Sequence, residues 1–439
     1  MPRAAEGDRV PLAPPHTVVE IARVLTDAGF ETWCVGGAVR DALLGESHLD
    51  WDLATAATPA QVRRLFRRTV PVGIEFGTVG VLDTANVMHE VTTFRRDVKT
   101  DGRHAVVEFG ASLDDDLARR DFTINAMAYD PLGGDLRDPF DGRRDLARRV
   151  VRAVGDPDAR MREDRLRALR AIRFAARFAF DIEPRTWRAV ADSAPYMTRL
   201  SPERVKQEIE KTMQQVRYAG RAIRLWRDSG ALAALIPPLA DVSDVTLESL
   251  NLLPPPRNES KPDREMQRLV ALLADLAPRD AERALRDLRF PNKTVAWVGS
   301  VLRGWTGIRD DVGRALSEPN GPSDGQLRRW AGTTGRTRAR SVWRLGAVRF
   351  AAERALGNPA PSANAVASAY RRAMRIAFRD PVEIGDLAVD GDDLISAGVP
   401  AGPQIKTVLA RLLDDVLEDP ARNTRDALLA RVANLIGRS

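Results

Sequence analysis

The spacing of apolar residues divides the chain into a part that alternates between strand and helix and a longer part that is helical. Residues 16–29 carry apolar side chains at helical spacing and end at a glycine, whereas residues 31–35 form a short strand-like run. Residues 77–94 are two strand-like runs joined by a polar turn, which predicts a hairpin. From about Val150 onward nearly every segment has helical spacing, with breaks such as the proline-rich residues 252–263. The pattern predicts an α/β head followed by a longer all-α body.

The other segments of the head fit the same alternation. Residues 58–68 begin with a threonine cap and a proline, which predicts a helix. Residues 106–110 read as a strand and residues 112–122 as a capped helix. Residues 123–131 then return to a strand pattern, so the head is expected to contain a small sheet with helices.

Charge and length narrow the class of protein. The chain has 439 residues, more than one ordinary core needs, so several domains are expected. Its net charge of +6 at pH 7 suits a polyanionic partner such as nucleic acid. An arginine-rich proteome with solvated arginines would give the same balance, so charge alone leaves both readings open.

The rarer residue types exclude other classes. One cysteine, Cys34, rules out an intrachain disulfide and fits an inert core thiol in a reducing cytoplasm. The four histidines have no ligand spacing, which disfavours a zinc site or a histidine-based phosphohydrolase. No apolar run is long enough for a membrane span, and the N-terminus does not resemble a secretory signal.

A pair of glycines, Gly36 and Gly37, follows the predicted strand and opens a predicted helix that carries Arg40. Backbone amides at a helix start bind anions, and glycine lets a phosphate approach closely. The segment lacks the residues of a Walker loop and the spacing of a Rossmann fingerprint. Taken alone, the glycine pair is weak evidence for phosphate binding, because a plain tight turn is the usual explanation of such a pair.

Asp50 and Asp52 are two positions apart on what reads as a strand, so their side chains are expected to face the same way. Two carboxylates at that distance repel each other unless a cation lies between them. Magnesium takes carboxylate and phosphate oxygens, and two such ions suit nucleotidyl transfer. The alternative is a solvent-facing polar edge strand. Glu90 is a candidate third carboxylate, but placing it beside the aspartates needs a strand order that the sequence does not give.

Five motifs occur in order along the chain: "GGAVRDALLG…LDWDLAT", "RRDFTINAMAYD", "DPFDGRRDL…VVRAVGDP", "REDRLRALRAIRFAARF" and "SPERVKQEIEK". The set closely resembles the class II tRNA nucleotidyltransferase and poly(A) polymerase family, whose tRNA enzymes build or repair the 3′ CCA end. The resemblance covers residues 18–211 and reappears in "DLISAGVPAGPQI", whereas residues 230–375 carry no motif of the family. It implies an α+β nucleotidyltransferase head, with a polymerase-β-like small sheet and helices, followed by an all-α neck, body and tail.

The resemblance also implies a division of labour. The head would be residues 1–145 and catalytic, and the neck would be residues 146–215 and would recognise the base. The body, residues 216–375, and the tail, residues 376–439, would contact tRNA. Asp50 and Asp52 would bind magnesium and be catalytic, with Glu90 as the candidate third ligand. The nucleotide would be held by Gly36, Gly37, Arg40, Arg120, Asp121, Asn125, Asp164, Arg167, Arg170 and Arg173. The base-reading helix would be supported by Glu163, Glu203, Arg204 and Glu208.

Base selection by Asp164 and Arg167 also has a physical rationale. Cytosine and adenine share an amino donor beside a ring-nitrogen acceptor, which a carboxylate and a guanidinium complement. Three apart on a helix, the two residues would be neighbours on its surface. Such a pair is expected to accept C or A and to reject G and U. From these two residues alone, an ordinary ion pair on a solvated face remains the alternative.

The implied function is template-independent addition or repair of the 3′ CCA end of tRNA from CTP and ATP, with release of pyrophosphate. The tRNA 3′-hydroxyl would attack the α-phosphate in line, assisted by two metal ions. The alternatives are an A-only enzyme, a poly(A) polymerase and a non-catalytic RNA-binding protein. Residues 95–109 look like a full-length flexible loop, which disfavours a CC-only enzyme. The expected partners are tRNA, CTP and ATP; no membrane or protein partner is indicated.

Overall fold

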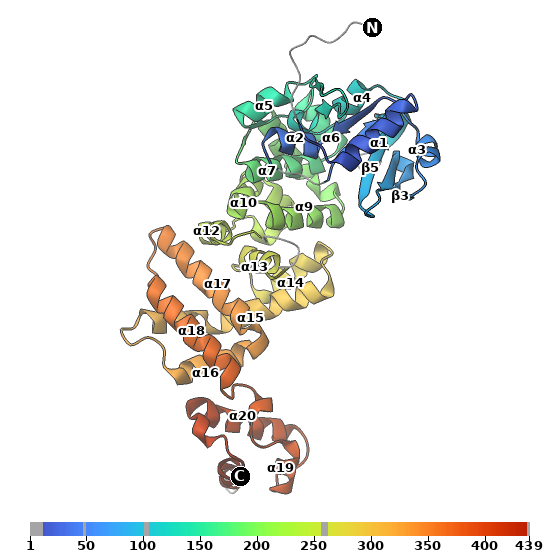
Figure 1. Cartoon of the computed structure of the whole chain (residues 1–439). Helices are drawn as coiled ribbons and strands as arrows, with labels where there is room; N and C mark the ends of the chain where they lie inside the picture. Colours follow the sequence, from blue (N-terminus) through green and yellow to red (C-terminus); the bar gives the residue numbers. More distant parts are fainter. Residues whose placement is uncertain (1–11, 47–49, 101–104, 256–261, 437–439) are drawn as a thin grey trace. The chain divides into compact units, whose positions relative to one another are not determined.

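The computed structural model describes residues 12–46, 50–100, 105–255 and 262–436. The chain divides into two compact units (Figure 1). Unit 1 comprises Met1–Glu208 and Leu225–Leu235, and unit 2 comprises Ile209–Arg224 and Ile236–Ser439. The predicted head and most of the predicted neck lie in unit 1, whereas residues 209–215 of the neck belong to unit 2. The predicted domain boundaries stay predictions.

A seven-stranded mixed sheet organises unit 1, with the strand order β3-β4-β5-β2-β1-β8-β9. Strands β2 and β5 are parallel, and the other neighbours are antiparallel. The predicted 77–94 hairpin is confirmed, because β4 and β5 pair directly. The strands of the sheet are β1 (Thr32–Val35), β2 (Asp52–Thr55), β3 (Thr69–Gly73), β4 (Thr78–Leu82), β5 (Met88–Thr93), β8 (Ala128–Tyr129) and β9 (Leu136–Arg137).

Two helices cover one face of this sheet, whereas the other face carries Asp52 and Glu90. That other face also packs Val35, Ala54 and Ala128 against Leu113 and Leu117 of helix α4 (Leu113–Ala118). On β5, His89 and Val91 are buried, whereas Met88 and Glu90 point to the opposite face. The covered face packs against helices α1 and α3, which contact β1, β2, β4 and β5. Cys34 on β1 is buried, as predicted, and its burial raises the pKa of the thiol.

Two helices of unit 1 begin at the capping residues that the sequence predicts. The predicted caps of α3 and α4 are confirmed, since Thr58 and Ser112 each accept a hydrogen bond from the third residue of the helix. The helices are α1 (His16–Asp27), α2 (Gly37–Leu43), α3 (Pro59–Leu65), α4 (Leu113–Ala118), α5 (Gly142–Arg148), α6 (Pro157–Glu163), α7 (Leu166–Phe178), α8 (Pro184–Ser193) and α9 (Pro202–Gln215), the last of which continues into unit 2.

Unit 1 differs from the prediction made from the sequence in three places. The strand predicted over 123–131 is only Ala128–Tyr129, because the segment before it is a 3₁₀ turn held by side-chain hydrogen bonds to Asp121 and Asp145. A short parallel pair, β10 (Val150–Val151) and β11 (Asp181–Ile182), lies within the part predicted to be helical. Within residues 95–109, strands β6 (Arg95–Thr100) and β7 (Ala105–Phe109) pair antiparallel. The prediction of a full-length flexible loop falls partly on 101–104, which lie outside the described residues.

Unit 2 is helical throughout the residues that the structure describes. Helix α15 is the longest and packs against α16 and α17. A separate hydrophobic cluster over residues 389–432 includes Leu394, Leu412 and Val416. No helix among the described residues combines the length and apolarity of a bilayer crossing. Of the helices after α9, α10 (Ala219–Asp228) is divided between the two units and α11 (Ala231–Leu235) belongs to unit 1. The helices of unit 2 that follow are α12 (Asp244–Leu252), α13 (Pro262–Leu272), α14 (Pro278–Asp287), α15 (Asn292–Ser317), α16 (Asp324–Thr334), α17 (Arg336–Ala355), α18 (Ala363–Arg379), α19 (Gly391–Ser396), α20 (Pro403–Glu418) and α21 (Arg425–Ile436).

Candidate active site

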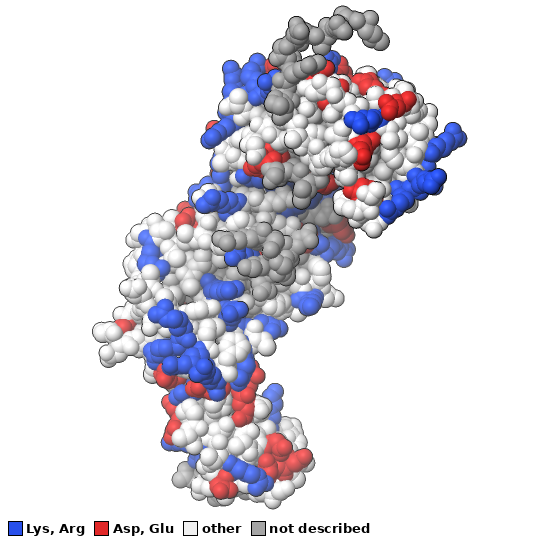
Figure 2. All heavy atoms as spheres, viewed as in Figure 1, with Lys and Arg blue, Asp and Glu red and all other residues white. Residues whose placement is uncertain are grey.

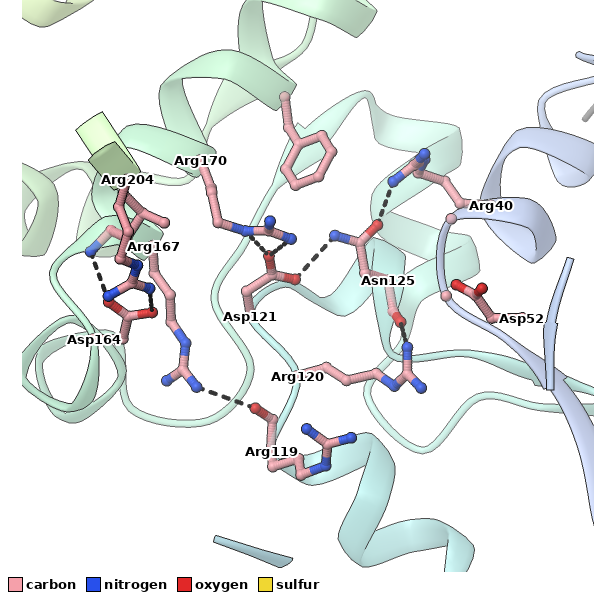
Figure 3. A pocket seen from close by; sticks show the side chains of 14 residues that line it. Arg40, Asp52, Arg119, Arg120, Asp121, Asn125, Asp164, Arg167, Arg170 and Arg204 are labelled. Atoms are coloured by element: carbon pink, nitrogen blue, oxygen red, sulfur yellow. Dashed lines mark hydrogen bonds and ion pairs between the residues drawn. The ribbon is translucent and has the colours of Figure 1, made fainter. Parts of the chain in front are cut away.

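A cavity of about 450 Å³ in unit 1 gathers nearly all of the predicted nucleotide-binding residues (Figure 3). It contains every residue predicted to hold the nucleotide except Arg173, together with the predicted metal ligand Asp52. Four of its residues were not predicted to hold nucleotide or metal: Arg204, which was predicted to support the base-reading helix, and Arg119, Leu166 and Phe174, which were not predicted site residues. The lining residues are Gly36, Gly37, Arg40, Asp52, Arg119, Arg120, Asp121, Asn125, Asp164, Leu166, Arg167, Arg170, Phe174 and Arg204.

The glycine pair forms the turn between β1 and α2 at the wall of the cavity. Gly36 has φ +77°, a backbone conformation that other residues rarely adopt. A Cβ on Gly36 would lie 2.9 Å from Nη1 of Arg120, so the site has no room for one. The glycine therefore serves both the backbone conformation and the approach of an arginine to the cavity.

Arg40 lies on α2, only 3% exposed. Its Nε donates to Oδ1 of Asp41 at 2.7 Å, its Nη1 donates to the side-chain oxygen of Asn125, and its guanidinium lies over the ring of Phe178. Burial lowers the pKa of Arg40, while the neighbouring Asp41 carboxylate opposes that shift. The arginine is thus fixed in place before any ligand arrives.

The motif "RRDFTINA" forms the middle of the cavity through three linked side chains. Asp121 accepts from the Asn125 amide at 2.9 Å and from Nε of Arg170 at 2.8 Å. Burial alone would raise the pKa of Asp121, but Arg170 and Asn125 outweigh it and lower the pKa. The same carboxylate raises the pKa of Arg170.

Arg119 and Arg120 are both anchored by Asp116, at 2.8 and 3.0 Å, and project cationic groups into the cavity. The arginine doublet before Asp121 was the sequence signal that could have identified Arg119.

Asp164 and Arg167 both line the cavity, but the expectation that they are neighbours on one helix is wrong. Helix α6 ends before Asp164 and α7 begins at Leu166, so Asp164 occupies the break between helices. Its Oδ1 accepts from the backbone amide of Leu166 at 3.0 Å, and its Oδ2 accepts from Arg204 at 2.7 Å. The Nη1 atom of Arg167 instead donates to Glu163 at 2.6 Å. The local bond to the start of α7 turns the Asp164 carboxylate away from the geometry of an uninterrupted helix.

The residues predicted to support this helix behave differently from one another. Glu163 holds Arg167, and Arg204 holds Asp164. Glu208 is buried and accepts from Nε of Arg173 at 2.7 Å. Arg173 therefore lies outside the cavity lining, in a buried pair. Glu203 is exposed in the first turn of α9 and does not line the cavity.

Of the three predicted metal ligands, Asp52 lines the cavity, and the charges of Asp50 and Glu90 are near enough to act on it. Strand β2 begins at Asp52, so Asp50 precedes the strand, and its side chain is exposed. The prediction that strand alternation aligns the two aspartates therefore does not apply to Asp50. The parallel pairing of Leu53 with Val91 sets Glu90 beside Asp52 on the same face. Burial, followed by the nearby Asp50 and Glu90 carboxylates, raises the pKa of Asp52 from 3.8 to about 6.

The carboxylates of Asp50, Asp52 and Glu90 suit a divalent cation. A bound cation would relieve the repulsion among them, which together with burial raises the pKa of Asp52. Within the part of the chain that the structure describes, no three acidic, histidine or cysteine side chains form a complete metal site. Magnesium binds through one or two carboxylates plus phosphate oxygens and water, so such a set suits it. Asp50, Asp52 and Glu90 are the groups available for this role.

Comparisons with known proteins agree on one family. The family models "Poly A polymerase head domain" and "Probable RNA and SrmB- binding site of polymerase A" match residues 32–152 and 179–242. The CCA-adding enzyme of Geobacillus stearothermophilus is 35% identical over 419 residues, which cover 93% of this chain and 94% of the relative. That of Geobacillus kaustophilus is 36% identical over 413 residues, with coverage of 93% and 94%. The crystal structure of the Bacillus stearothermophilus CCA-adding enzyme in complex with CTP has a TM-score of 0.73 and 31% identity, covering 96% of this chain and 97% of that one.

Proposed function

This chain belongs to the family of CCA-adding enzymes, and we propose that it adds or repairs the 3′ CCA end of tRNA in the cavity of unit 1. The substrates are CTP, ATP and a tRNA 3′ end, and pyrophosphate is the second product. A single observation carries the assignment of the reaction to this cavity. Asp52, which has the Asp50 and Glu90 carboxylates nearby, lines the cavity together with several arginines. A triphosphate bound there would present its α-phosphate to the carboxylates.

The triphosphate would be held by the glycine turn and by arginines 40, 119, 120 and 170. Five N–H donors on each guanidinium suit phosphate oxygens, and these arginines are already oriented by Asp41, Asp116 and Asp121. Asn125 is held between Arg40 and Asp121, and its position suits contact with the ribose. The base would lie toward Asp164 and Arg167, on the side of the cavity formed by α7 and the break that precedes it.

Base selection would use the remaining hydrogen-bonding capacity of two separately anchored groups. Asp164 is held by Arg204 and by the start of α7, and Arg167 is held by Glu163. The carboxylate would accept from the amino group of C or A, and the guanidinium would donate to the ring nitrogen. A base with the opposite pattern would leave buried groups unpaired, which costs about 1–3 kcal/mol for each group.

In the reaction, the 3′-oxygen of tRNA forms a bond to the α-phosphorus while the bond to the β-phosphate oxygen breaks. The hydroxyl proton passes to solvent, and the pyrophosphate leaves with its charge balanced by the arginines. Asp50, Asp52 and Glu90 would hold Mg²⁺, which supplies activation of the hydroxyl and stabilisation of developing charge when bound. We place the reaction in the cytoplasm, where tRNA ends are processed.

The tRNA would extend over the helical unit. Exposed arginines on α17 and α18, including Arg340, Arg344, Arg371 and Arg375, supply positive charge for a phosphate backbone. Figure 2 shows basic side chains gathered over the C-terminal half of α18. These side chains support the body as a tRNA-contacting region, and contact by the tail, residues 376–439, is proposed from the family resemblance alone.

The test uses purified protein, Mg²⁺ and each labelled nucleotide with three transcripts of one tRNA. One transcript lacks CCA, one ends in CC and one ends in CCA. Addition of two C and one A to the shortest transcript is the expected result. Addition of A alone, only to the CC-ended transcript, would indicate an A-only enzyme, and long A tails would indicate a poly(A) polymerase. Asp52→Asn serves as the control that assigns incorporation to this cavity, because it should abolish transfer.

A further inference from the structure

We propose that an apolar strip beside Glu90, formed by Val70, Val72 and Met88, binds the last two nucleotides of the RNA 3′ end. The inference rests on the proposed function, since it concerns how the attacking hydroxyl reaches the carboxylates. It assigns a binding surface to strands β3, β4 and β5, which contribute no lining residue to the nucleotide cavity.

Strand pairing places the strip on the same face of the sheet as Glu90. Gly80 of β4 is the direct partner of Glu90 on β5, so both positions face the same way. A Cβ on Gly80 would lie 2.7 Å from Sδ of Met88 and 2.9 Å from Cγ2 of Val72. These two side chains therefore lie over the glycine, directly next to Glu90. Val70 pairs with Gly80 from the other side and extends the strip onto β3.

The exposure of these side chains is unusual for the sheet in which they lie. Val70, Val72 and Met88 are 36%, 38% and 40% exposed. On the opposite face of the same strands, Val79 and Val81 are buried under the covering helices. Scattered exposed apolar residues need no explanation, but adjoining ones beside a group of carboxylates mark a surface for contact with a ligand.

The geometry of the reaction identifies that ligand. Strand β2, which carries Asp52, lies between β1 and β5. Gly36 and Gly37, which line the nucleotide cavity, follow β1, whereas Glu90 lies on β5. In-line displacement places the attacking hydroxyl opposite the leaving pyrophosphate. A pyrophosphate on the β1 side therefore requires the RNA end to approach from the side of β5, β4 and β3. There the nucleoside that carries the hydroxyl, and the one before it, meet the strip.

The chemistry of the strip suits this occupant. Base faces and ribose C–H groups are apolar and lie well on aliphatic side chains, and such contact is tolerant of sequence. The strip offers no side-chain hydrogen-bonding groups, so it would hold ends of different sequence in the same place. A growing CCA end changes its terminal base after each addition, and a surface of this kind would accept each intermediate.

The test is a double-mutant cycle between the strip and the RNA. The protein variant is Val72→Thr with Met88→Gln, which preserves side-chain size while adding polar groups. The RNA is a tRNA ending in CC, with the base removed from either the last or the penultimate nucleotide but the ribose and 3′-hydroxyl intact. Val24→Thr on α1, where the side chain is 41% exposed, is the matched control. Melting temperatures verify folding, and the single variant Val70→Thr is available should the double variant unfold.

We expect the double variant to lower kcat/KM for A addition to intact RNA about tenfold, with the KM for ATP unchanged, because the strip lies outside the nucleotide cavity. With the abasic RNA whose missing base normally contacts the strip, the variant should cause little further loss, since coupled changes are not additive. Fully multiplicative losses at both RNA positions, or unchanged activity of the variants on intact RNA, would overturn the inference. Failure of the wild-type protein to extend any tRNA would instead refute the proposed function.

Discussion

The Oδ2 atom of Asp164 lies 2.7 Å from Nη2 of Arg204, a residue of α9 that is 40 positions later in the chain. The other oxygen of the carboxylate accepts from the amide of Leu166. The carboxylate is therefore held in one orientation at the cavity by two bonds from different helices. Its remaining lone pairs stay available to an amino group of a base.

The first prediction concerns this contact. Arg204→Ala should lower the preference for CTP over UTP about tenfold, because Asp164 would lose its fixed orientation while its charge remains. Single-turnover incorporation with each of the four nucleotides measures the effect. Arg185→Ala, an exposed position on α8, is the control and should leave the preference unchanged. Unchanged discrimination in Arg204→Ala would mean that the orientation of Asp164 does not select the base.

The same region illustrates what the sequence could predict. Motif residues spread over 169 positions, from Gly36 to Arg204, do meet in one cavity. The pairing among them was not predictable, because the break before Leu166 depends on a local hydrogen bond that helical spacing does not reveal. The two residues of the proposed base-reading pair consequently have different partners.

The sheet shows the same limit in another form. On β5, Glu90 faces away from its buried neighbours His89 and Val91, as strand alternation requires. Its position beside Asp52 follows only from the pairing of β2 with β5, which are separated in sequence by two other strands. Arg173 is an example of the opposite kind, since the family resemblance implied that it holds the nucleotide but its side chain is buried against Glu208. Non-local packing decides such cases.

The second prediction concerns pH and the pKa of Asp52, which is raised from 3.8 to about 6. Because the folded state binds this proton more tightly than the unfolded state, the contribution of Asp52 to stability falls as the pH rises from about 4 to 6. In the metal-free protein at pH 7, Asp52→Asn should therefore raise the free energy of unfolding of unit 1 by about 1–3 kcal/mol. Thermal unfolding at pH 4.5 and pH 7 measures the change.

Two comparisons make this prediction specific. The gain from Asp52→Asn should be much smaller at pH 4.5, where the carboxyl group is already protonated in the folded state. Added Mg²⁺ should raise the melting temperature of the wild type at pH 7 more than that of the variant. Asp192→Asn, an exposed position on α8, is the control for loss of one negative charge. An equal gain at both pH values would contradict the raised pKa.

The third prediction concerns the glycine turn. Gly36→Ala should raise the KM for CTP and ATP about tenfold, because the new Cβ would lie 2.9 Å from Nη1 of Arg120 and displace it. Gly29→Ala is a matched control: Gly29 also has positive φ, at +88°, but nothing lies within 4 Å of its Cβ position. Both variants should lose about 1 kcal/mol of stability through backbone strain. Steady-state kinetics should show a change in KM for Gly36→Ala only, and equal KM values in both variants would contradict the role of the turn.

The last prediction concerns Arg268 of α13, whose side chain is fully buried in unit 2. Its guanidinium donates to the backbone carbonyls of Met213, Val216, Arg217 and Leu253 at 2.7–3.0 Å. These carbonyls belong to the last turn of α9 and the segments that follow α9 and α12, so one side chain satisfies acceptors that helix ends leave unpaired. Burial lowers the pKa of Arg268 to about 10, which still leaves it charged at neutral pH.

Arg268→Met should destabilise unit 2 by about 3–5 kcal/mol, because it fills a similar volume but leaves several buried carbonyls without donors. Arg268→Lys should recover only part of the loss, since one ammonium group has three donors and cannot match the planar geometry of the guanidinium. Calorimetry suits the measurement, because a chain of two units need not unfold in a single transition. Arg344→Met, an exposed arginine on α17, is the control and should shift the transition little. If the prediction is right, the melting temperatures of Arg268→Met and the control differ. Equal melting temperatures would mean that the buried guanidinium contributes no net stability, because its hydrogen bonds only offset the cost of burying its charge.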